Sequence, residues 1–361
     1  MKILALTRYS RLGASSRLRT LQYLPALERE GYEIEIAPFF DDAYLADLYT
    51  GRSNITRVLG YFTKRIRKMI NASDNDLIWI EKEALPWAPW AFERRIMPRN
   101  VPYLVDYDDS VFHRYDHHEN FIVRMALSKK IDGVMSGAAC VTVGNDYLAQ
   151  RALDAGARNV KYLPTVVDMD RYFVKLRDPV KSRVCIGWIG TPNTWKGSAE
   201  PIFQALKSTL RERKARFRAV GADLKHRNIE DLEVIPWSED SEVFEVQSFD
   251  VGIMPLHDDP WTQGKCGYKL IQYMACGLPV VASPIGVNKR IVQHGVNGFL
   301  AETEEEWRNA VKTLIDRPEL RRKMGAKGRE LVQAQYSLQE WAPKLSNILR
   351  ATPGIRVRAA V

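Results

Sequence analysis

The stretch from Gly264 to Val281, GKCGYKLIQYMACGLPVV, constrains the fold more than any other part of the sequence. Small and cationic residues come first, and the apolar residues of the following YKLIQYMA have helical spacing. Gly277-Leu278-Pro279 then breaks the helix before the β-branched pair Val280-Val281. The stretch therefore predicts a loop, a helix and a buried strand.

The beginning of this predicted helix suits a diphosphate. A glycine-rich loop that leads into a helix presents unpaired backbone N–H groups and the positive end of the helix dipole. Lys265 and Lys269 add full positive charges. From these residues alone, an ordinary loop with two solvated lysines is an equally good interpretation.

The rest of the chain alternates predicted strands and helices. Lys2–Thr7 is a short apolar strand that a Gly/Ser loop connects to a helix, and Arg183–Gly190 starts the same pattern again. This alternation predicts an α/β protein with parallel sheets, in which ligands bind at the strand ends. With 361 residues, the chain is long enough for two domains, each with its own core.

Composition limits the class of protein. Hydrophobic residues make up 45% and charged residues 27%, and no apolar run reaches the roughly 18 residues of a membrane span. The four cysteines form no C-x-x-C pair, so we expect reduced thiols in a cytoplasmic protein. The net charge of +9 permits attraction to nucleic acid, anionic lipid or phosphorylated molecules. Because no aromatic-basic reading motif occurs, we expect no nucleic-acid partner.

Three aspartates end the predicted strand Val101–Asp109. Asp106, Asp108 and Asp109 are costly to place together unless they are solvated, paired with cations or used. Asp106 and Asp108 also form the pattern D-x-D, which can hold a divalent metal between its carboxylates and a diphosphate. The nearby histidines His113, His117 and His118 lack an established ligand spacing, and a polar loop is the preferred interpretation.

The segment Arg52–Ile70 predicts a basic amphipathic helix. Its apolar residues fall at helical spacing among many cations. Such a helix either packs its apolar stripe on a sheet and leaves its charges in water, or lies on an anionic membrane. The membrane alternative would place the protein at the inner membrane face.

The stretch that begins at Gly264 resembles the donor-site helix of retaining family 4 glycosyltransferases, written E-x7-E followed by A-x-G-x-P-V-V-A. Met274–Ala282 follows the second half closely, whereas Gly264 and Gln272 stand at the two glutamate positions. The resemblance implies that Gln272 hydrogen-bonds a ribose hydroxyl. Because Gly264 has no side chain, sugar recognition is expected from the backbone of residues 265–267 and from Asp258 and Asp259.

Other segments resemble the same family in the same order. Lys196-Gly197 matches its G-R-x4-K-G motif after Gly190, with Thr191 in place of the arginine, and Asp108 replaces a histidine that contacts the donor sugar. The first loop, with Gly13, Ser16 and Arg17, corresponds to a family loop that faces the interdomain cleft. Leu163–Phe173 resembles the interdomain hinge. We therefore expect domains at residues 1–165, completed by a helix within 341–361, and at residues 166–340.

The resemblance implies the GT-B fold, with two Rossmann-like doubly wound parallel-sheet domains that face a central cleft. The implied activity is a hexosyltransferase that moves a sugar, with retention, from a UDP- or GDP-sugar to a glycan or lipid-linked acceptor in cell-surface polysaccharide or glycoconjugate biosynthesis. No metal and no permanently bound cofactor are implied. Asp108, Asp109 and Lys196 are the expected catalytic residues, and the expected donor-binding residues are Gly13, Ser16, Arg17, Gly190, Thr191, Lys196, Lys265, Gly267, Tyr268, Lys269 and Gln272.

Three alternatives stay open from the sequence. A metal-dependent transferase would use Asp106 and Asp108, and a sugar-nucleotide epimerase would share the two-domain fold. The third is a nucleotide-sugar binding protein that has lost catalysis. It is motivated by the departures from the family motifs at Gly264, Thr191 and Asp108.

Overall fold

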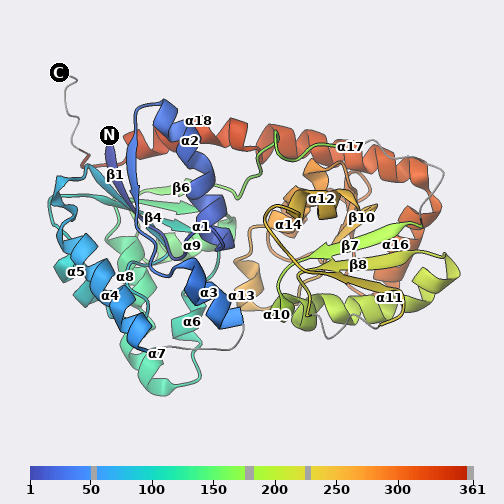
Figure 1. Cartoon of the computed structure of the whole chain (residues 1–361), viewed down its shortest axis with the longest axis horizontal. Coiled ribbons are helices and arrows are strands. Elements are labelled where there is room, and N and C mark those ends of the chain that lie inside the picture. Colours follow the sequence, from blue (N-terminus) through green and yellow to red (C-terminus); the bar gives the residue numbers. More distant parts are fainter. Residues whose placement is uncertain (50–54, 175–182, 224–228, 356–361) are drawn as a thin grey trace. The chain divides into compact units, whose positions relative to one another are not determined.

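The computed structural model describes residues 1–49, 55–174, 183–223 and 229–355. They form two compact α/β units, each built on one parallel sheet (Figure 1). Unit 1 comprises Met1–Thr165, Gly264–Cys266 and the residues from Trp341 on, and unit 2 comprises Val166–Gln263 and Gly267–Glu340. The sequence placed Gly264–Cys266 in the C-terminal domain, whereas in the structure these three residues pack with unit 1.

The sheet of unit 1 has six parallel strands in the order β2-β1-β3-β4-β5-β6. Its central strands are buried along their whole length because helices cover both faces, as expected for a doubly wound sheet. The strands are β1 (Lys2–Leu6), β2 (Glu33–Ile36), β3 (Leu77–Glu81), β4 (Tyr103–Tyr107), β5 (Cys140–Val143) and β6 (Val160–Tyr162).

Nine α-helices of unit 1 lie in the described ranges between Met1 and Thr165, and their apolar faces build one core with the sheet. The first helix follows the loop around Gly13, as the sequence predicts. The helices are α1 (Ala14–Arg19), α2 (Leu24–Arg29), α3 (Asp42–Tyr49), α4 (Ile55–Ile70), α5 (Trp90–Ile96), α6 (His113–Asp116), α7 (Phe121–Leu127), α8 (Lys130–Ser136) and α9 (Asp146–Asp154).

Helix α4 is the predicted basic amphipathic helix. Phe62, Ile66 and the fully buried Met69 pack into the core of unit 1, so its apolar stripe lies on the protein. Lys64 and Arg67 face solvent. The packing alternative therefore describes the middle of this helix, whereas Leu59 and Ile70 are 63% and 55% exposed, and contact of the helix with a membrane stays a prediction. The first three residues of the predicted segment, 52–54, lie outside the described residues.

The sheet of unit 2 also has six parallel strands, in the order β12-β11-β10-β7-β8-β9. Gly252 in β10 lies under the ring of Tyr273, where a Cβ would come within 2.3 Å of that ring. The strands are β7 (Cys185–Ile189), β8 (Arg216–Val220), β9 (Leu232–Ile235), β10 (Val251–Met254), β11 (Val280–Ala282) and β12 (Gly298–Leu300).

The loop, helix and strand predicted after Gly264 are present as residues 264–267, α14 and β11. The second half of α14 is buried all round, because every residue from Leu270 to Ala275 is buried. The helices of unit 2 are α10 (Pro192–Thr194), α11 (Glu200–Glu212), α12 (Glu242–Gln247), α13 (Pro260–Gln263), α14 (Tyr268–Ala275), α15 (Asn288–Ile291), α16 (Glu304–Asp316) and α17 (Pro318–Gln335).

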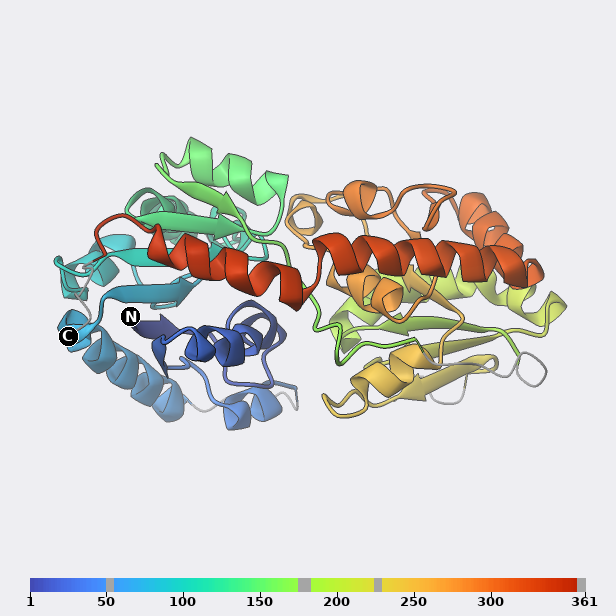
Figure 2. The same ribbon diagram turned by 90° about the horizontal axis from the view of Figure 1, so that it is seen from above.

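The last helix, α18 (Leu338–Arg350), returns the chain to unit 1 (Figure 2). The Tyr32 hydroxyl donates to the carbonyl of Ser346 at 3.0 Å, and the guanidinium of Arg350 lies 2.9 Å from the carboxylate of Glu30. These contacts fix α18 beside the start of β2. Residues 356–361 of the predicted C-terminal segment lie outside the described residues.

Within the described ranges, we find no helix that combines the length and the apolar character needed to cross a bilayer.

Candidate active site

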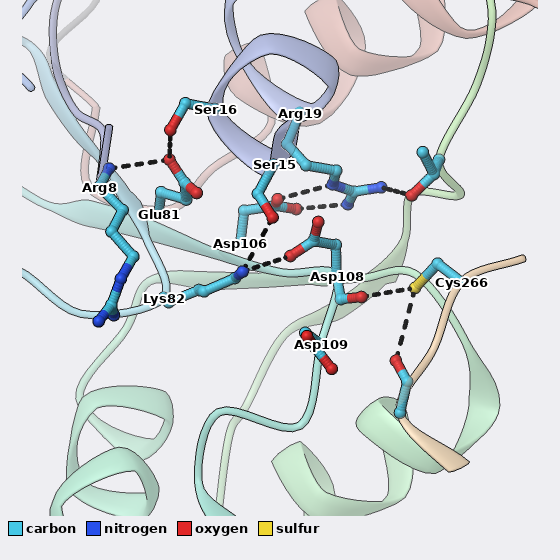
Figure 3. Close-up of polar contacts among 12 residues, drawn as sticks. Arg8, Ser15, Ser16, Arg19, Glu81, Lys82, Asp106, Asp108, Asp109 and Cys266 are labelled. Atoms are coloured by element: carbon cyan, nitrogen blue, oxygen red, sulfur yellow. Dashed lines mark hydrogen bonds and ion pairs between the residues drawn. The ribbon is translucent and has the colours of Figure 1, made fainter. Parts of the chain in front are cut away.

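The polar groups of unit 1 gather where β1, β3 and β4 end (Figure 3). Carboxyl ends of parallel strands meet at one edge of a sheet, so the loops after them share a site. Arg8 follows β1, Lys82 follows β3, and Asp108 and Asp109 follow β4. Ser15, Ser16 and Arg19 come from α1.

Asp106 is paired with an arginine. Two nitrogens of Arg19 donate to its two carboxylate oxygens at 2.6 and 2.8 Å, and Thr142 adds a hydrogen bond at 2.6 Å. Both charged side chains are buried, with 1% and 2% of their surface exposed. A metal held by Asp106 and Asp108 would have to displace this guanidinium, so the D-x-D alternative does not fit this geometry.

Asp108 is held by a lysine. The Lys82 ammonium lies 2.9 Å from the Asp108 carboxylate and donates to Ser15 Oγ at 3.0 Å. Burial alone would raise the pKa of Asp108, but the charges of Lys82 and Arg19 outweigh it and lower the pKa to about 2. Asp108 therefore stays ionised at neutral pH, where it accepts hydrogen bonds and does not act as an acid.

Lys82 has a backbone that few lysines adopt, with φ at 66°. Its neighbours in sequence are also fixed, since Glu81 accepts hydrogen bonds from the Arg8 amide at 2.9 Å and from Ser16 Oγ at 2.6 Å. Sequence analysis missed this lysine. The alternating charges of Glu81, Lys82 and Glu83 at a strand end are the sequence feature that could have identified it.

Asp109 contacts the segment Gly264–Cys266. The Lys265 ammonium lies 3.0 Å from its carboxylate, and the Cys266 thiol donates to the carbonyl oxygen of Asp108 at 3.1 Å. The prediction assigned Lys265 to the donor diphosphate, whereas in the structure Asp109 already compensates its charge. Asn145 holds the same segment through the carbonyl of Lys265, at 2.9 Å.

The packing of Gly264 explains one departure from the family motif. A Cβ at this position would lie 2.6 Å from the Cβ of Ser110 and 2.7 Å from its backbone nitrogen. Any larger residue, including the glutamate of the family motif, would force the segment away from Ser110.

The predicted residues of the first loop point into the fold. Ser16 has no exposed surface, and Arg17 is 4% exposed with one guanidinium nitrogen 3.1 Å from the carbonyl of Arg11. A Cβ at Gly13 would collide with Tyr9 at 2.3 Å. These residues shape the loop in the structure, and their contact with a donor stays a prediction.

In unit 2, the predicted diphosphate motif begins where β7 ends. Thr191 and Thr194 form a capping box that starts α10 directly after Gly190. The chain then forms one turn of π-helix, Trp195–Ala199, which contains Lys196 and Gly197. Such turns are rare and are frequent at functional sites. Trp195 is buried, whereas Lys196 is exposed to solvent.

Three other predicted residues lie at the start of α14. Gly267 has a left-handed backbone, with φ at 70°, and a Cβ there would collide with Ile291. The ammonium of Lys269 lies 4.8 Å from the ring centroid of Trp188, at the end of β7. Tyr268 is half-buried and its hydroxyl lies 3.2 Å from that of Tyr172.

Gln272 lies in a buried polar chain. Its amide donates to the Tyr172 hydroxyl at 2.8 Å, and that hydroxyl donates to Glu242 at 2.6 Å. Only 1% of Gln272 is exposed. The predicted hydrogen bond to a ribose would therefore require the pair with Tyr172 to open. Sequence analysis missed Tyr172 because it lies far from α14 in the chain.

One group of side chains has metal-ligand character. Ligand atoms of His113, Asp116 and His117 in and after α6 all lie within 4.8 Å of one another. However, His113 bonds both Asp116 and Tyr147, and a nitrogen of Arg151 lies 3.1 Å from Asp116. A guanidinium at that distance disfavours a second cation, so these residues fit a hydrogen-bonded network better than a metal site.

The C-terminal half matches a known family. Residues 183–317 match the family model described as glycosyl transferases group 1. The chain is 36% identical over 73 residues to N-acetyl-alpha-D-glucosaminyl L-malate synthase of Bacillus anthracis, a match that spans 19% of this chain and 19% of that protein.

Solved structures resemble the whole chain. HepE (Alr3699) of Anabaena, solved in complex with UDP-glucose, matches with a TM-score of 0.71 and 18% identity over 97% of this chain and 100% of that chain. Sucrose-phosphate synthase of Thermosynechococcus elongatus matches with a TM-score of 0.71 and 15% identity over 97% of this chain and 98% of that chain. The predicted GT-B fold is confirmed, and residues 183–317 carry the sequence signature of the group 1 glycosyl transferase family.

Proposed function

We propose that this protein is a glycosyltransferase that moves a hexose, with retention, from a UDP- or GDP-sugar to a glycan or lipid-linked acceptor. The observation that carries the proposal is the family match over residues 183–317, which contain the exposed Lys196 and the start of α14. Bound UDP and UDP-glucose in the HepE structures support a nucleotide-sugar donor. The proposed pathway is the synthesis of cell-surface polysaccharide or glycoconjugate.

The proposed donor-binding groups belong to unit 2. Negative charge grows on the leaving diphosphate as the sugar departs, and fixed positive groups lower that barrier. Lys196, Lys269 and the amides at the start of α14 would supply this charge. In a retaining transfer on the front face, the leaving phosphate helps to deprotonate the acceptor, so no protein nucleophile is required.

Unit 1 is proposed to bind the acceptor. Asp108 is ionised and stays partly exposed at the strand ends, so it is suited to accept hydrogen bonds from acceptor hydroxyls. Asp109 and Lys265 lie beside it as an ion pair. These groups orient an acceptor and do not themselves form a covalent bond with the sugar.

The test is a transfer assay with UDP- and GDP-sugars and a panel of glycan and lipid-linked acceptors. We expect one donor to give product, in an EDTA-resistant reaction, with the anomeric configuration of the donor retained by NMR. Conversion of the donor without an acceptor would identify an epimerase. Donor binding without transfer to any acceptor would favour a protein that has lost catalysis.

Lys196→Ala tests the donor site in the same assay, with Lys312→Ala as the control because Lys312 is an exposed lysine of α16. Loss of one charged contact should weaken donor binding about tenfold to a hundredfold in calorimetry. Because Lys196 is exposed, Lys196→Ala should leave the melting temperature unchanged. Equal donor affinity in both variants would remove Lys196 from the donor site.

We also propose a cytoplasmic location with peripheral contact to an anionic membrane. The four cysteines are free and buried, as expected for a reducing compartment. Helix α7 presents an exposed apolar surface: Phe121, Ile122 and Met125 are 66%, 66% and 69% exposed. Arg124 and Lys129 flank them with positive charge, which favours anionic headgroups.

Vesicle co-sedimentation tests this contact. We expect binding to vesicles that contain phosphatidylglycerol, and loss of binding when Phe121, Ile122 and Met125 are replaced by serine. Lys64→Ala and Arg67→Ala in α4 serve as charge controls. Equal sedimentation of the serine variant and the wild type would exclude α7 as the membrane surface.

A further inference from the structure

Trp87 is an exposed tryptophan in the loop of residues 82–89, which connects β3 to α5. It is 47% exposed, whereas the other eight tryptophans of the chain are buried or half-buried. A single exposed apolar residue is common on protein surfaces and says little by itself. What sets Trp87 apart is the backbone that presents it.

The backbone of Trp87 is in the left-handed region, with φ at 64°. The Cβ of a bulky residue crowds the backbone there, so glycine or asparagine is the usual occupant. Within the described ranges, four non-glycine residues have a positive φ, and two of them, Lys82 and Trp87, lie in this one loop. Such strain persists only where the surrounding structure enforces it, and it is concentrated at active sites and ligand-binding sites.

Buried polar contacts fix this loop before the chain reaches Trp87. The Lys130 ammonium donates to the Glu83 carboxylate and to the carbonyl of Leu85, both at 2.5 Å. Glu83 also pairs with Arg8 at 3.0 Å, and the side chains of Glu83 and Lys130 are 1% and 0% exposed. The backbone of Leu85 is therefore tied to α8, and the next two residues carry the chain to the exposed Trp87.

Two side chains from the segment after β4 hold the indole ring. The Trp87 amide donates to the Tyr115 hydroxyl at 3.1 Å, and the two rings meet edge to face with their centroids 5.2 Å apart. His118 meets the indole in the same way at 5.7 Å. Because β3 and β4 are neighbours in the sheet, Trp87 and the ionised Asp108 belong to neighbouring loops at one sheet edge. A ring that is fixed in advance loses little conformational entropy when a ligand covers it.

We propose that Trp87 is a stacking platform for a pyranose ring of the acceptor. One face of a pyranose carries C–H groups, which pack on a flat aromatic surface, while its hydroxyls stay free for polar partners at the strand ends. The inference rests on the proposed function in assigning this ring to the acceptor, because residues 82–89 belong to unit 1 and the proposed donor-binding lysines belong to unit 2. The acceptor class is therefore a glycan, free or lipid-linked, and not a small non-sugar alcohol.

Binding is tested without turnover. The full chain, labelled on the tryptophan indole nitrogen, is titrated with cellotriose, chitotriose and β-1,4-galactotriose, and with malate as a small non-sugar alcohol, while the Nε1–Hε1 resonances are followed by NMR. Saturating UDP and GDP block the donor site, and Trp87→Phe assigns the Trp87 resonance by its disappearance. We expect a saturable shift of this resonance with at least one trisaccharide. A shift with malate alone, or with none of the four compounds, overturns the platform.

Variants provide the matched comparison, with the affinity for the same trisaccharide measured by ligand-observed NMR. We expect Trp87→Ala to weaken binding about tenfold, because the stacked aromatic surface is lost, and Trp87→Phe to lie between Trp87→Ala and the wild type. Phe92→Ala is the control, since Phe92 is an aromatic residue of unit 1 with nearly the same exposure, 45%. Equal affinity in Trp87→Ala and Phe92→Ala counts against the platform.

Trp87→Gly separates binding from a purely structural role. Glycine adopts the left-handed backbone without strain, so the relief of strain offsets the lost ring contacts and the melting temperature should not fall. The affinity for the trisaccharide should fall as it does in Trp87→Ala. A tryptophan with only a structural role predicts the reverse, a lower melting temperature and unchanged binding, and that result would exclude the platform. All affinities are measured below the melting temperature of every variant.

Transfer kinetics then connect the platform to the acceptor. Trp87→Ala should raise KM for the acceptor about tenfold and leave KM for the donor unchanged. If Trp87→Ala and Phe92→Ala transfer sugar equally well, the proposed function stands and the platform does not. If a trisaccharide shifts the Trp87 resonance but the protein transfers no sugar, the platform stands and the proposed function does not.

Vesicle co-sedimentation distinguishes a sugar from a membrane as the partner of Trp87. His118, which contacts the indole, lies shortly before α7, so an exposed tryptophan here could also belong to the proposed membrane surface. We expect Trp87→Ala to sediment with phosphatidylglycerol vesicles as the wild type does. Loss of sedimentation together with unchanged trisaccharide binding would assign Trp87 to the membrane surface and refute the platform.

Discussion

Lys82 and Asp108 form an ion pair at 2.9 Å although they follow different strands, β3 and β4. Both side chains are largely buried, with 10% and 14% of their surface exposed. The pair joins the two central loops of unit 1, and its lysine also holds α1 through Ser15. Removing one partner from such a pair leaves the other charge buried and uncompensated.

Asp108→Asn should therefore lower both stability and turnover. We expect a loss of about 3 kcal/mol in urea unfolding at pH 7, and a larger fall in kcat than in donor affinity. Because the folded pKa of about 2 is depressed, this contribution is present above pH 4 and is lost as the pH falls through about 2. Asp170→Asn, at an exposed position, is the control. Normal turnover in Asp108→Asn would remove this residue from the site.

The raised pKa of Glu93 predicts that stability depends on pH in the opposite direction. Its folded pKa of about 7 lies above the unfolded value of roughly 4.3, so the folded state holds the proton more tightly. Stability should therefore fall as the pH rises from about 4.3 to about 7, by at most about 4 kcal/mol from this group. Glu93→Gln should flatten the curve of unfolding free energy against pH, whereas the exposed Glu319→Gln should not. Parallel curves for wild type and Glu93→Gln would contradict the raised pKa.

Strand and helix positions could be predicted from the sequence because their signals are local. Val280-Val281 after Gly277-Leu278-Pro279 marks β11, and the glycine before Tyr268 marks the start of α14. The parallel sheets follow from the alternation of these elements. The resemblance to GT-B enzymes added the prediction that one chain contains two such sheets.

The partners of the polar residues could not be predicted, because they come from distant parts of the chain. Asp108 was identified as a site residue, but Lys82 was not, since no spacing rule connects the ends of two strands. Gln272 was assigned to a ribose from its place in the motif, and only the structure shows Tyr172 against its amide. Likewise, nothing in the sequence around Lys265 indicates its contact with Asp109.

Gly264 gives a prediction that contrasts with the family motif. Gly264→Glu restores the motif residue, but its Cβ would lie 2.6 Å from the Cβ of Ser110. We expect both this variant and Gly264→Ala to be destabilised by about 1–3 kcal/mol, with lower melting temperatures. Gly60→Ala is the control, because no atom lies within 4 Å of its added Cβ and the residue belongs to helix α4. An unchanged or higher melting temperature in Gly264→Glu would show that the segment does not pack on Ser110.

The ion pair between Lys265 and Asp109 is suited to a double-mutant cycle. Their nitrogen and oxygen lie 3.0 Å apart, and both side chains are only partly exposed, at 31% and 20%. Lys265→Ala, Asp109→Ala and the double variant should show a coupling energy of about 0.5–1 kcal/mol in urea unfolding. The surface pair Lys327–Glu330, which is 50% and 64% exposed, should show less.

The same cycle also tests whether a change at Asp109 affects the start of α14 through the chain segment that joins them. Lys265 lies between α13 and α14, so a change at Asp109 reaches the start of α14 through two residues, Cys266 and Gly267. If the pair holds this segment, Asp109→Ala should lower donor affinity as well as stability, and Lys265→Ala should add little to that loss. Additive effects of the two substitutions on both quantities would show that the segment is held by Cys266 and Asn145 alone.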